Sequence, residues 1–259
     1  MVASQLRANA RESLQGKWGK AALLTLCCAL ITFVIGFVLA FIPIIGQLVN
    51  FVISLPISFG LLVSFMKLKR GEDVTYTDFL NIGFSNFGKV WGVFGNMLLK
   101  MIIPIVLVVI FLIIFAVGMG GSFTGLMATT YSSHSYAGMA TGFGGVAIIG
   151  MIGYIVSLIY AVIKGYLYSL SYYVLYDNPD KTGKEIVEIS ESLMRGNRWR
   201  FFWLGLTFIG WAILSVFTLY IGMLWLMPYI MVTFVCFYED LAGNNSTTQK
   251  VEDNNPIEE

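Results

Sequence analysis

The apolar residues of this chain lie in long uninterrupted blocks rather than at the three-and-four spacing of a soluble amphipathic helix. A bilayer core about 30 Å thick needs about 20 apolar residues of α-helix to cross it. Blocks of this kind cover residues 21–42, 44–66, 97–117, 146–172, 200–219 and 221–238. The pattern therefore predicts an all-α, polytopic membrane protein with about six transmembrane helices. Very short connections within the first and last pairs of blocks predict antiparallel hairpins.

A short polar segment with apolar residues at helical spacing precedes each predicted hairpin. The three segments end in similar text, "GKWGK", "FGKVWG" and "RGNRWR". A glycine there (Gly16, Gly88 or Gly196) can end the helix by adopting a positive φ. We interpret this as an internal repeat, in which each unit is a cytoplasmic interfacial amphipathic helix followed by a hairpin. The units cover about 4–66, 75–176 and 182–238. The alternative is that a Gly-basic-Trp pattern simply recurs at membrane surfaces.

Composition supports the membrane class. Hydrophobic residues make up 57% of the chain and charged residues 12%, and the mean hydropathy is +0.78. Soluble domains have about 45–50% apolar and about 25% charged residues. We therefore expect a single integral membrane domain over residues 1–241. The polar, acidic remainder, 242–259, is predicted to be a disordered cytoplasmic tail.

The distribution of lysine and arginine predicts the orientation. Basic residues precede the first span and lie between spans two and three and between spans four and five. The other connections, 43–46, 118–145 and 219–222, contain no Lys or Arg. Because cytoplasmic loops carry an excess of Lys and Arg, both termini are expected in the cytoplasm.

Basic and aromatic residues after each amphipathic segment are expected at the level of the lipid headgroups. We take them as candidate contacts with membrane lipids, anionic headgroups among them: Lys17, Trp18, Lys89, Trp91, Arg195, Arg198, Trp199 and Arg200. Nothing in the pattern indicates a nucleic-acid partner, and it identifies no protein partner.

Lys164 lies deep inside the fourth apolar block and is a candidate intramembrane polar site, although snorkelling toward the surface is equally open. No carboxylate lies in any span, which argues against a proton-coupled pump. The sole histidine, His134, has no second histidine or nearby acid to complete a metal site. Catalytic motifs are absent from the sequence, so we predict no catalytic residue, metal or cofactor, and a protein that is not an enzyme.

The stretch 118–145 is uncharged and rich in Gly, Ser and Thr. This composition favours a flexible outer loop. A re-entrant segment that packs through its closely spaced glycines is the alternative.

The C-terminal third, "ESLMRGNRWRFFWLGLTFIGWAILSVFTLYIGMLWLMPYIMVTFVCFYEDL", resembles the bacterial membrane proteins catalogued as domain of unknown function 975. The stretches "ARESLQGKWGKAALLTL" and "LKRGEDVTYTDF" match that family as well, and "RGNRW" and "FYEDL" are its more specific motifs. The resemblance implies a multi-span protein of the bacterial cytoplasmic membrane. It carries over no catalytic or ligand-binding residue.

Two functional hypotheses remain. The first is a non-enzymatic accessory or scaffold in envelope or lipid homeostasis, motivated by the large cytoplasmic interface. The second is a small permease or exporter with a path between helices kinked at Pro56, Pro104 and Pro228. The second hypothesis requires the polar residues of the second span to face one cavity; these are Gln47, Asn50, Ser54 and Ser58.

The predicted orientation has a direct test. A short tag at either terminus is expected to stay unlabelled by an impermeant reagent in intact cells and to become labelled after lysis. The reason is the cost of carrying the basic segments through hydrocarbon. Labelling of either tag in intact cells would overturn the orientation.

Overall fold

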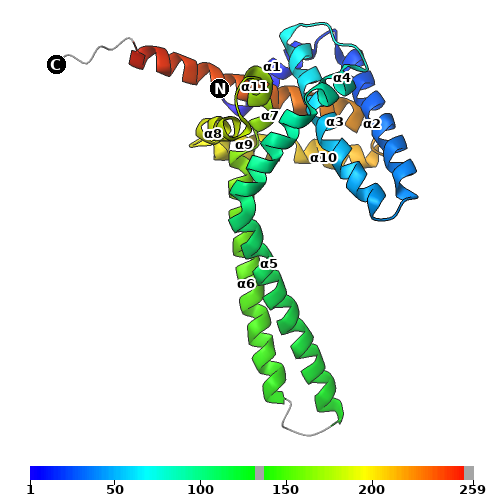
Figure 1. Cartoon of the computed structure of the whole chain (residues 1–259), viewed down its shortest axis with the longest axis vertical. Helices are drawn as coiled ribbons and strands as arrows, with labels where there is room; N and C mark the ends of the chain where they lie inside the picture. Colours follow the sequence, from blue (N-terminus) through cyan, green and yellow to red (C-terminus); the bar gives the residue numbers. More distant parts are fainter. Residues whose placement is uncertain (132–136, 254–259) are drawn as a thin grey trace, which may run out of the picture. The chain divides into compact units, whose positions relative to one another are not determined.

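The computed structural model of the protein describes residues 1–131 and 137–253, with side chains for 1–127 and 144–243. Every regular element in these ranges is an α-helix (Figure 1). Six helical stretches are long and apolar enough to cross a membrane, and they coincide with the six apolar blocks. The stretches are Trp18–Ala40, Ile45–Arg70, Phe87–Met127, Gly144–Asp177, Arg198–Phe217 and Met223–Gly243. The all-helical, multi-pass class predicted from the sequence is thereby confirmed.

The chain divides into two compact units, residues 1–95 with 169–259 and residues 96–168. Helix α5 (Phe87–Tyr131) begins in the first unit and continues into the second, which also holds α6 (Ala137–Leu167). The other helices belong to the first unit. They are α1 (Ala3–Leu14), α2 (Trp18–Ala40), α3 (Ile45–Arg70), α4 (Asp78–Ser85), α7 (Ser171–Asp177), α8 (Gly183–Met194), α9 (Arg198–Leu206), α10 (Ile209–Phe217) and α11 (Met223–Asp253).

Helices α1 and α8 have the same length and the same ending. Each has 12 residues and is followed by a residue in extended conformation and then by a glycine with positive φ. The φ angles are +73° at Gly16 and +81° at Gly196. Glycine is required there because a side chain strains the left-handed conformation. The chain then turns directly into α2 or α9.

The two helices also bury corresponding faces. The buried positions of α1 are Leu6, Ala10 and Leu14, and those of α8 include Ile186, Ser190 and Met194. Spacing of about one helical turn places each set on one side of its helix, as expected for a helix that packs on a core.

A capping box starts α8. The Thr182 amide donates to the Glu185 carboxylate at 2.8 Å, and the Glu185 amide donates to the Thr182 hydroxyl at 3.4 Å. The amide donor, together with the Thr182 hydroxyl, lowers the pKa of Glu185 from its ordinary value. These contacts satisfy backbone donors that the first turn of a helix leaves unpaired.

The middle short helix ends differently from the other two. The sequence pattern suggested that Gly88 ends it with a positive φ, but Gly88 lies in the first turn of α5. Helix α4 instead ends at Ser85 with Asn86 as its cap, and the Asn86 side chain donates to the Ile82 carbonyl at 2.9 Å. An asparagine side chain that satisfies a terminal carbonyl removes the need for a left-handed glycine.

Glycines allow α4 to lie against α3. A Cβ atom at Gly60 of α3 would lie 1.8 Å from the Phe79 carbonyl oxygen of α4, and one at Gly83 would lie 2.2 Å from the Pro56 carbonyl oxygen. Backbones this close require residues without side chains, as at many helix crossings in membranes.

Pro56 interrupts the hydrogen-bond ladder of α3, and the neighbouring helix compensates. A proline has no N–H, so the carbonyl of Val52, four residues earlier, loses its partner. The indole N–H of Trp91, on α5, donates to that carbonyl at 3.3 Å. Helix α3 therefore continues past Pro56 to Arg70.

The fifth span, predicted as one helix over 200–219, consists of two helices. Helices α9 and α10 have nine residues each and meet at a turn of Thr207 and Phe208. The turn satisfies its own polar groups, since the Thr207 hydroxyl donates to the Leu204 carbonyl at 2.7 Å. Irregular backbone at membrane depth is tolerated only when it is paired or covered in this way.

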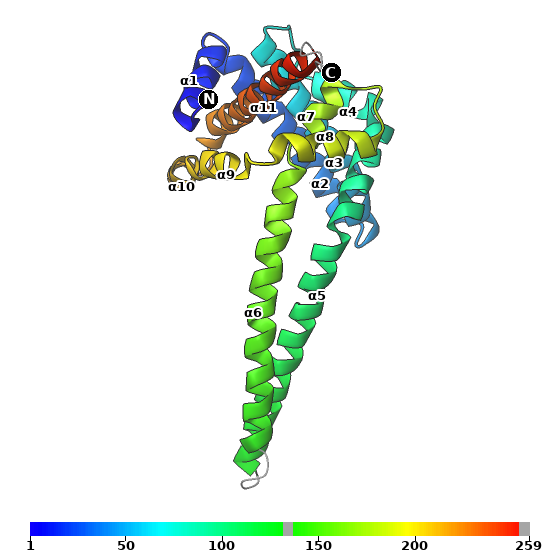
Figure 2. The same cartoon turned by 90° about the vertical axis from the view of Figure 1, so that its left-hand side faces the viewer.

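The second unit contains two long helices that run side by side (Figures 1 and 2). Close contacts join them: a Cβ at Gly118 would lie 2.4 Å from the Ala147 amide nitrogen, and one at Gly150 would lie 2.5 Å from that of Phe115. Residues 118–131 and 137–145 are helical, so the expectation of a flexible loop over 118–145 is wrong for these residues. Small residues stabilise helix here by permitting close packing. His134 lies outside the described residues.

Helix α11 continues past residue 242, where the sequence predicts the start of a disordered tail, and ends at Asp253. Residues 254–259 of that tail lie outside the described residues.

The glycine contact between α3 and α4 makes a prediction. Gly60→Ala should destabilise the protein by about 1–3 kcal/mol because the two backbones must separate. Gly92→Ala, in α5, is a matched control, since nothing lies within 4 Å of a Cβ there. The control should be stabilised by about 0.5–1 kcal/mol through helix propensity. Thermal unfolding of detergent-solubilised protein measures both, and equal midpoints would contradict the packing.

Candidate functional site

Four charged residues and a tyrosine from three helices meet in what we call the helix-end cluster, consisting of Lys69, Arg70, Asp177, Tyr238 and Glu239. The Arg70 guanidinium donates two hydrogen bonds to the Asp177 carboxylate, at 2.8 and 2.9 Å. Its Nε donates to Glu239 at 3.2 Å. Two parallel bonds between a guanidinium and a carboxylate form a strong and directional pair. The cluster thus joins the ends of α3 and α7 to α11.

Two further contacts complete the helix-end cluster. Lys69 forms an ion pair with Glu239, and the Tyr238 hydroxyl donates to Asp177 at 2.9 Å. Arg70 and Asp177 are 29% and 28% exposed, so water screens the pair only partly. Two cations face two carboxylates, and the cluster carries no net charge.

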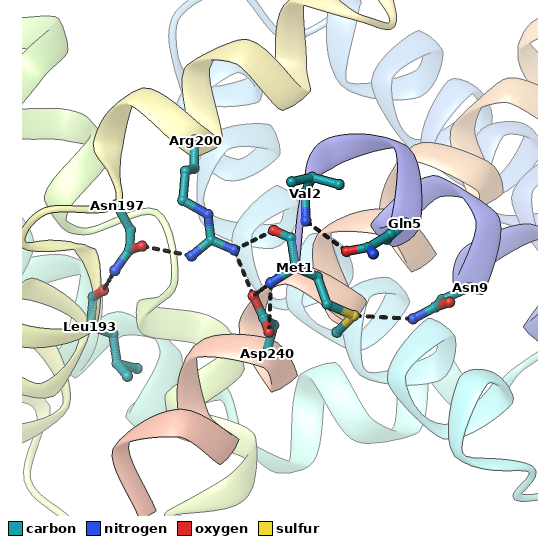
Figure 3. A network of polar contacts seen from close by, with 8 residues as sticks. All are labelled: Met1, Val2, Gln5, Asn9, Leu193, Asn197, Arg200 and Asp240. Carbon is teal, nitrogen blue, oxygen red and sulfur yellow. Dashed lines mark hydrogen bonds and ion pairs between the residues drawn. The ribbon is translucent and has the colours of Figure 1, made fainter. Parts of the chain in front are cut away.

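A second network surrounds Arg200 at the start of α9 (Figure 3). Its Nη2 donates to the Asp240 carboxylate and to the Met1 carbonyl, both at 2.6 Å. Its Nη1 donates to the Asn197 side chain at 2.8 Å. The terminal amino group of Met1 also contacts Asp240, at 2.9 Å. Arg200, proposed from the sequence as a headgroup contact, is therefore engaged with the protein itself.

The first two candidate headgroup residues also contact the protein. The Lys17 ammonium donates to the Leu68 carbonyl at 3.1 Å, and a cation at the carboxyl end of α3 satisfies an otherwise unpaired acceptor. The Trp18 ring lies 6.2 Å from that of Tyr229. Nearby, a hydrogen bond from Lys20 lowers the pKa of Asp73 below its ordinary value.

The two candidates of the middle unit, Lys89 and Trp91, differ in their exposure and contacts. Lys89 is exposed in the first turns of α5. Trp91 is half-buried and hydrogen-bonded to α3, with its ring 5.7 Å from that of Phe51. Trp91 therefore supports the helix that carries Pro56.

The remaining candidates lie at the junction of α8 and α9. Arg195 is 72% exposed and contacts Glu191, one turn back, at 3.2 Å. Trp199 is 71% exposed. Arg198 is half-buried, and among the side chains that the structure describes its Nε has no hydrogen-bond partner.

Lys164 lies in the second unit. Its ammonium is 5.9 Å from the ring centroid of Tyr160, one helical turn away. This distance fits a cation–π contact within α6.

A cavity of about 600 Å³ lies in the first unit, lined by residues of α1, α2, α10 and α11. Arg7 and Arg11 line it together with Trp18, Trp211 and Trp225. Sequence reasoning missed the two arginines as site residues, although their spacing of four was a usable signal for a shared helix face.

The polar residues of α3 do not line this cavity. Gln47 and Ser58 are exposed, and the Ser54 hydroxyl donates to the Phe51 carbonyl at 2.9 Å. These residues therefore do not support the shared polar path that the permease hypothesis requires.

Within residues 1–131 and 137–253, no three His, Cys, Asp or Glu side chains lie close enough to hold a metal ion. Cys27, Cys28 and Cys236 are not in disulfides.

These features define a multi-pass helical protein of the membrane type, in which ion pairs join α3, α7 and α11. The chain belongs to the family described as protein of unknown function DUF975, whose sequence profile matches residues 1–245. The match confirms the resemblance seen in the sequence. No curated protein and no solved structure matches the chain.

The helix-end cluster can be tested by comparing two arginines. Arg70→Ala leaves two half-buried carboxylates with fewer donors and should destabilise the protein by about 1–3 kcal/mol. Arg195→Ala removes an exposed pair between residues four apart and should cost about 0.3–0.5 kcal/mol. Chemical or thermal unfolding in detergent measures the difference. If the two variants unfold alike, the cluster does not stabilise the fold.

Proposed function

We propose that the protein is a non-enzymatic accessory or scaffold protein of the bacterial cytoplasmic membrane that binds anionic lipid headgroups. One observation carries the proposal: Arg198 and Trp199 begin α9 without being used in the ionic contacts that engage Arg200 and Arg70. Arg198 is half-buried, its Nε has no partner among the described side chains, and the adjacent Trp199 is 71% exposed. This pair is suited to a phosphate at the membrane interface.

We infer that α1, α4 and α8 are the interfacial helices of three related units, and corresponding features support this. The glycines that follow α1 and α8 share a positive φ. In the span after each short helix, one residue two turns in is almost completely buried; these residues are Leu24, Val93 and Leu204. Equivalent burial is expected when equivalent segments pack in the same way.

The proposed orientation places both termini in the cytoplasm. The helix-end cluster supports it, because charged residues of α3, α7 and α11 gather together and satisfy one another. Charged groups are stable at an aqueous boundary and costly in hydrocarbon. The basic segments that flank them agree with a cytoplasmic face.

The proposal of a non-enzymatic role rests on how the carboxylates are used. Asp177, Glu239 and Asp240 each contact an arginine, a lysine or the terminal amino group. A general acid or base needs a carboxyl group that is available to a substrate. Paired groups of this kind stabilise helix contacts instead.

The proposal is tested with Arg195→Gln combined with Arg198→Gln. Each basic residue near an anionic surface contributes about 1 kcal/mol, so removing two should weaken binding of phosphatidylglycerol about tenfold or more. Native mass spectrometry of the detergent-solubilised protein counts the bound lipids, with phosphatidylcholine as the neutral reference.

The control is Lys181→Gln combined with Lys184→Gln, which removes the same charge from the other end of α8. At physiological salt the Debye length is about 8 Å, much less than the ~18 Å length of a helix of this size. The control should therefore change binding by less than about threefold. Equal binding of both lipids by the unmodified protein would overturn the proposed function.

A further inference from the structure

The cavity in the first unit has a positively charged end. Arg7 and Arg11 are four residues apart on α1 and both line it. The Nε of Arg7 is buried and has no hydrogen-bond partner among the side chains that the structure describes. None of the lining residues is an Asp or a Glu. Two guanidinium groups with no acid among the lining residues leave this end positively charged, and an anion is its electrostatic complement.

The rest of the cavity is apolar and aromatic. Trp18 of α2, Trp211 of α10, and Trp225 and Tyr229 of α11 form its walls. Trp211 is 56% and Trp225 48% exposed, so the cavity opens beside them to the surroundings of the two apolar spans. An aromatic wall of this kind contacts a hydrocarbon chain well and does not serve a free inorganic ion.

The two aliphatic hydroxyls of the lining are already used by the backbone. Ser215 donates to the Ala212 carbonyl at 2.7 Å, and Thr218 donates to the Ser215 carbonyl at 2.9 Å. A neutral sugar headgroup needs such donors free, whereas a phosphate needs mainly the guanidinium groups. The two guanidinium groups therefore favour a charged headgroup.

Trp211 and Ser215 of α10 line the same space as the two arginines of α1.

We propose that the cavity binds one anionic phospholipid, with its phosphate between Arg7 and Arg11 and an acyl chain along Trp211 and Trp225. The inference deepens the proposed function and rests on it, because it adds a defined site for one lipid to the headgroup contacts proposed at Arg198 and Trp199. This site shares only Trp18 with the residues selected from the sequence.

The experiment uses the full chain, delipidated in a neutral maltoside detergent. Phosphatidylglycerol, phosphatidylcholine with the same acyl chains, and inorganic phosphate are titrated separately. Native mass spectrometry gives the affinity of the first bound lipid. Phosphatidylglycerol with brominated chains gives an independent readout, since bromine quenches nearby tryptophan fluorescence.

Arg7→Gln with Arg11→Gln should weaken the first phosphatidylglycerol at least tenfold, and Arg7→Lys with Arg11→Lys should restore part of the affinity. Arg195→Gln with Arg198→Gln, outside the cavity, should leave the affinity of the first phosphatidylglycerol unchanged and weaken only the lipids that bind after it. Leu214→Trp changes a lining residue that is 54% exposed; it keeps both arginines and should weaken binding by filling the space. Trp211→Phe should lower the quenched fraction, whereas Trp203→Phe on α9 should not.

Each outcome is decisive. Weaker binding in the Arg7 and Arg11 variant together with the Leu214 variant supports the site. Unchanged first-lipid affinity in both, with the unmodified protein still preferring phosphatidylglycerol, overturns the cavity site and leaves the proposed function standing. Inorganic phosphate that competes at the same concentration as the lipid overturns the lipid assignment. A protein without any preference for anionic lipid overturns both proposals.

Discussion

The bidentate pair between Arg70 and Asp177 is the contact on which the first unit depends. It joins residues 107 positions apart, and the contact of Arg70 with Glu239 spans 169. In a membrane the hydrophobic effect does little to hold helices together, because lipid is as apolar as the side chains it replaces. Partly buried ionic contacts, which join the ends of α3 and α7 to α11, hold these helices together instead. They select which helices meet, since an apolar surface alone does not distinguish partners.

The same requirement explains the contacts inside the unit. A polar group without a partner is costly in an apolar medium, and the structure satisfies the groups that its own irregularities expose. Trp91 bonds to the carbonyl that Pro56 leaves unpaired, and Lys17 bonds to a carbonyl at the end of α3. Glycines at the contact of α3 and α4 then bring backbones close enough for dispersion forces to act over many atoms. Polar pairing and close approach are thus complementary ways of holding helices together here.

The sequence predicts the parts of this fold that depend on local composition. Six apolar blocks identified six spans because the cost of polar groups in hydrocarbon acts on each segment separately. The turn at Thr207 and Phe208 contains no proline and no helix-ending glycine, so the sequence gives no signal that the helix is interrupted there. The helical character of residues 118–131 was missed because Gly, Ser and Thr are typical of loops in water, whereas between two membrane helices they permit contact. Nothing in the spacing of Trp91 indicates that its partner is a carbonyl on another helix. Contacts between distant segments decided these features.

Helix α5 has a length that a simple crossing does not use. Its 45 residues extend about 67 Å, against about 30 Å for the hydrocarbon core. Fitting that length inside the core requires a tilt of about 60°, beyond the roughly 40° limit seen for membrane helices. A helix that enters the bilayer near its first turns must therefore emerge and continue as a rigid rod outside it. Phe123, Leu126 and Met127 near its far end are exposed, so the part of α5 beyond the hydrocarbon core presents apolar side chains to its surroundings.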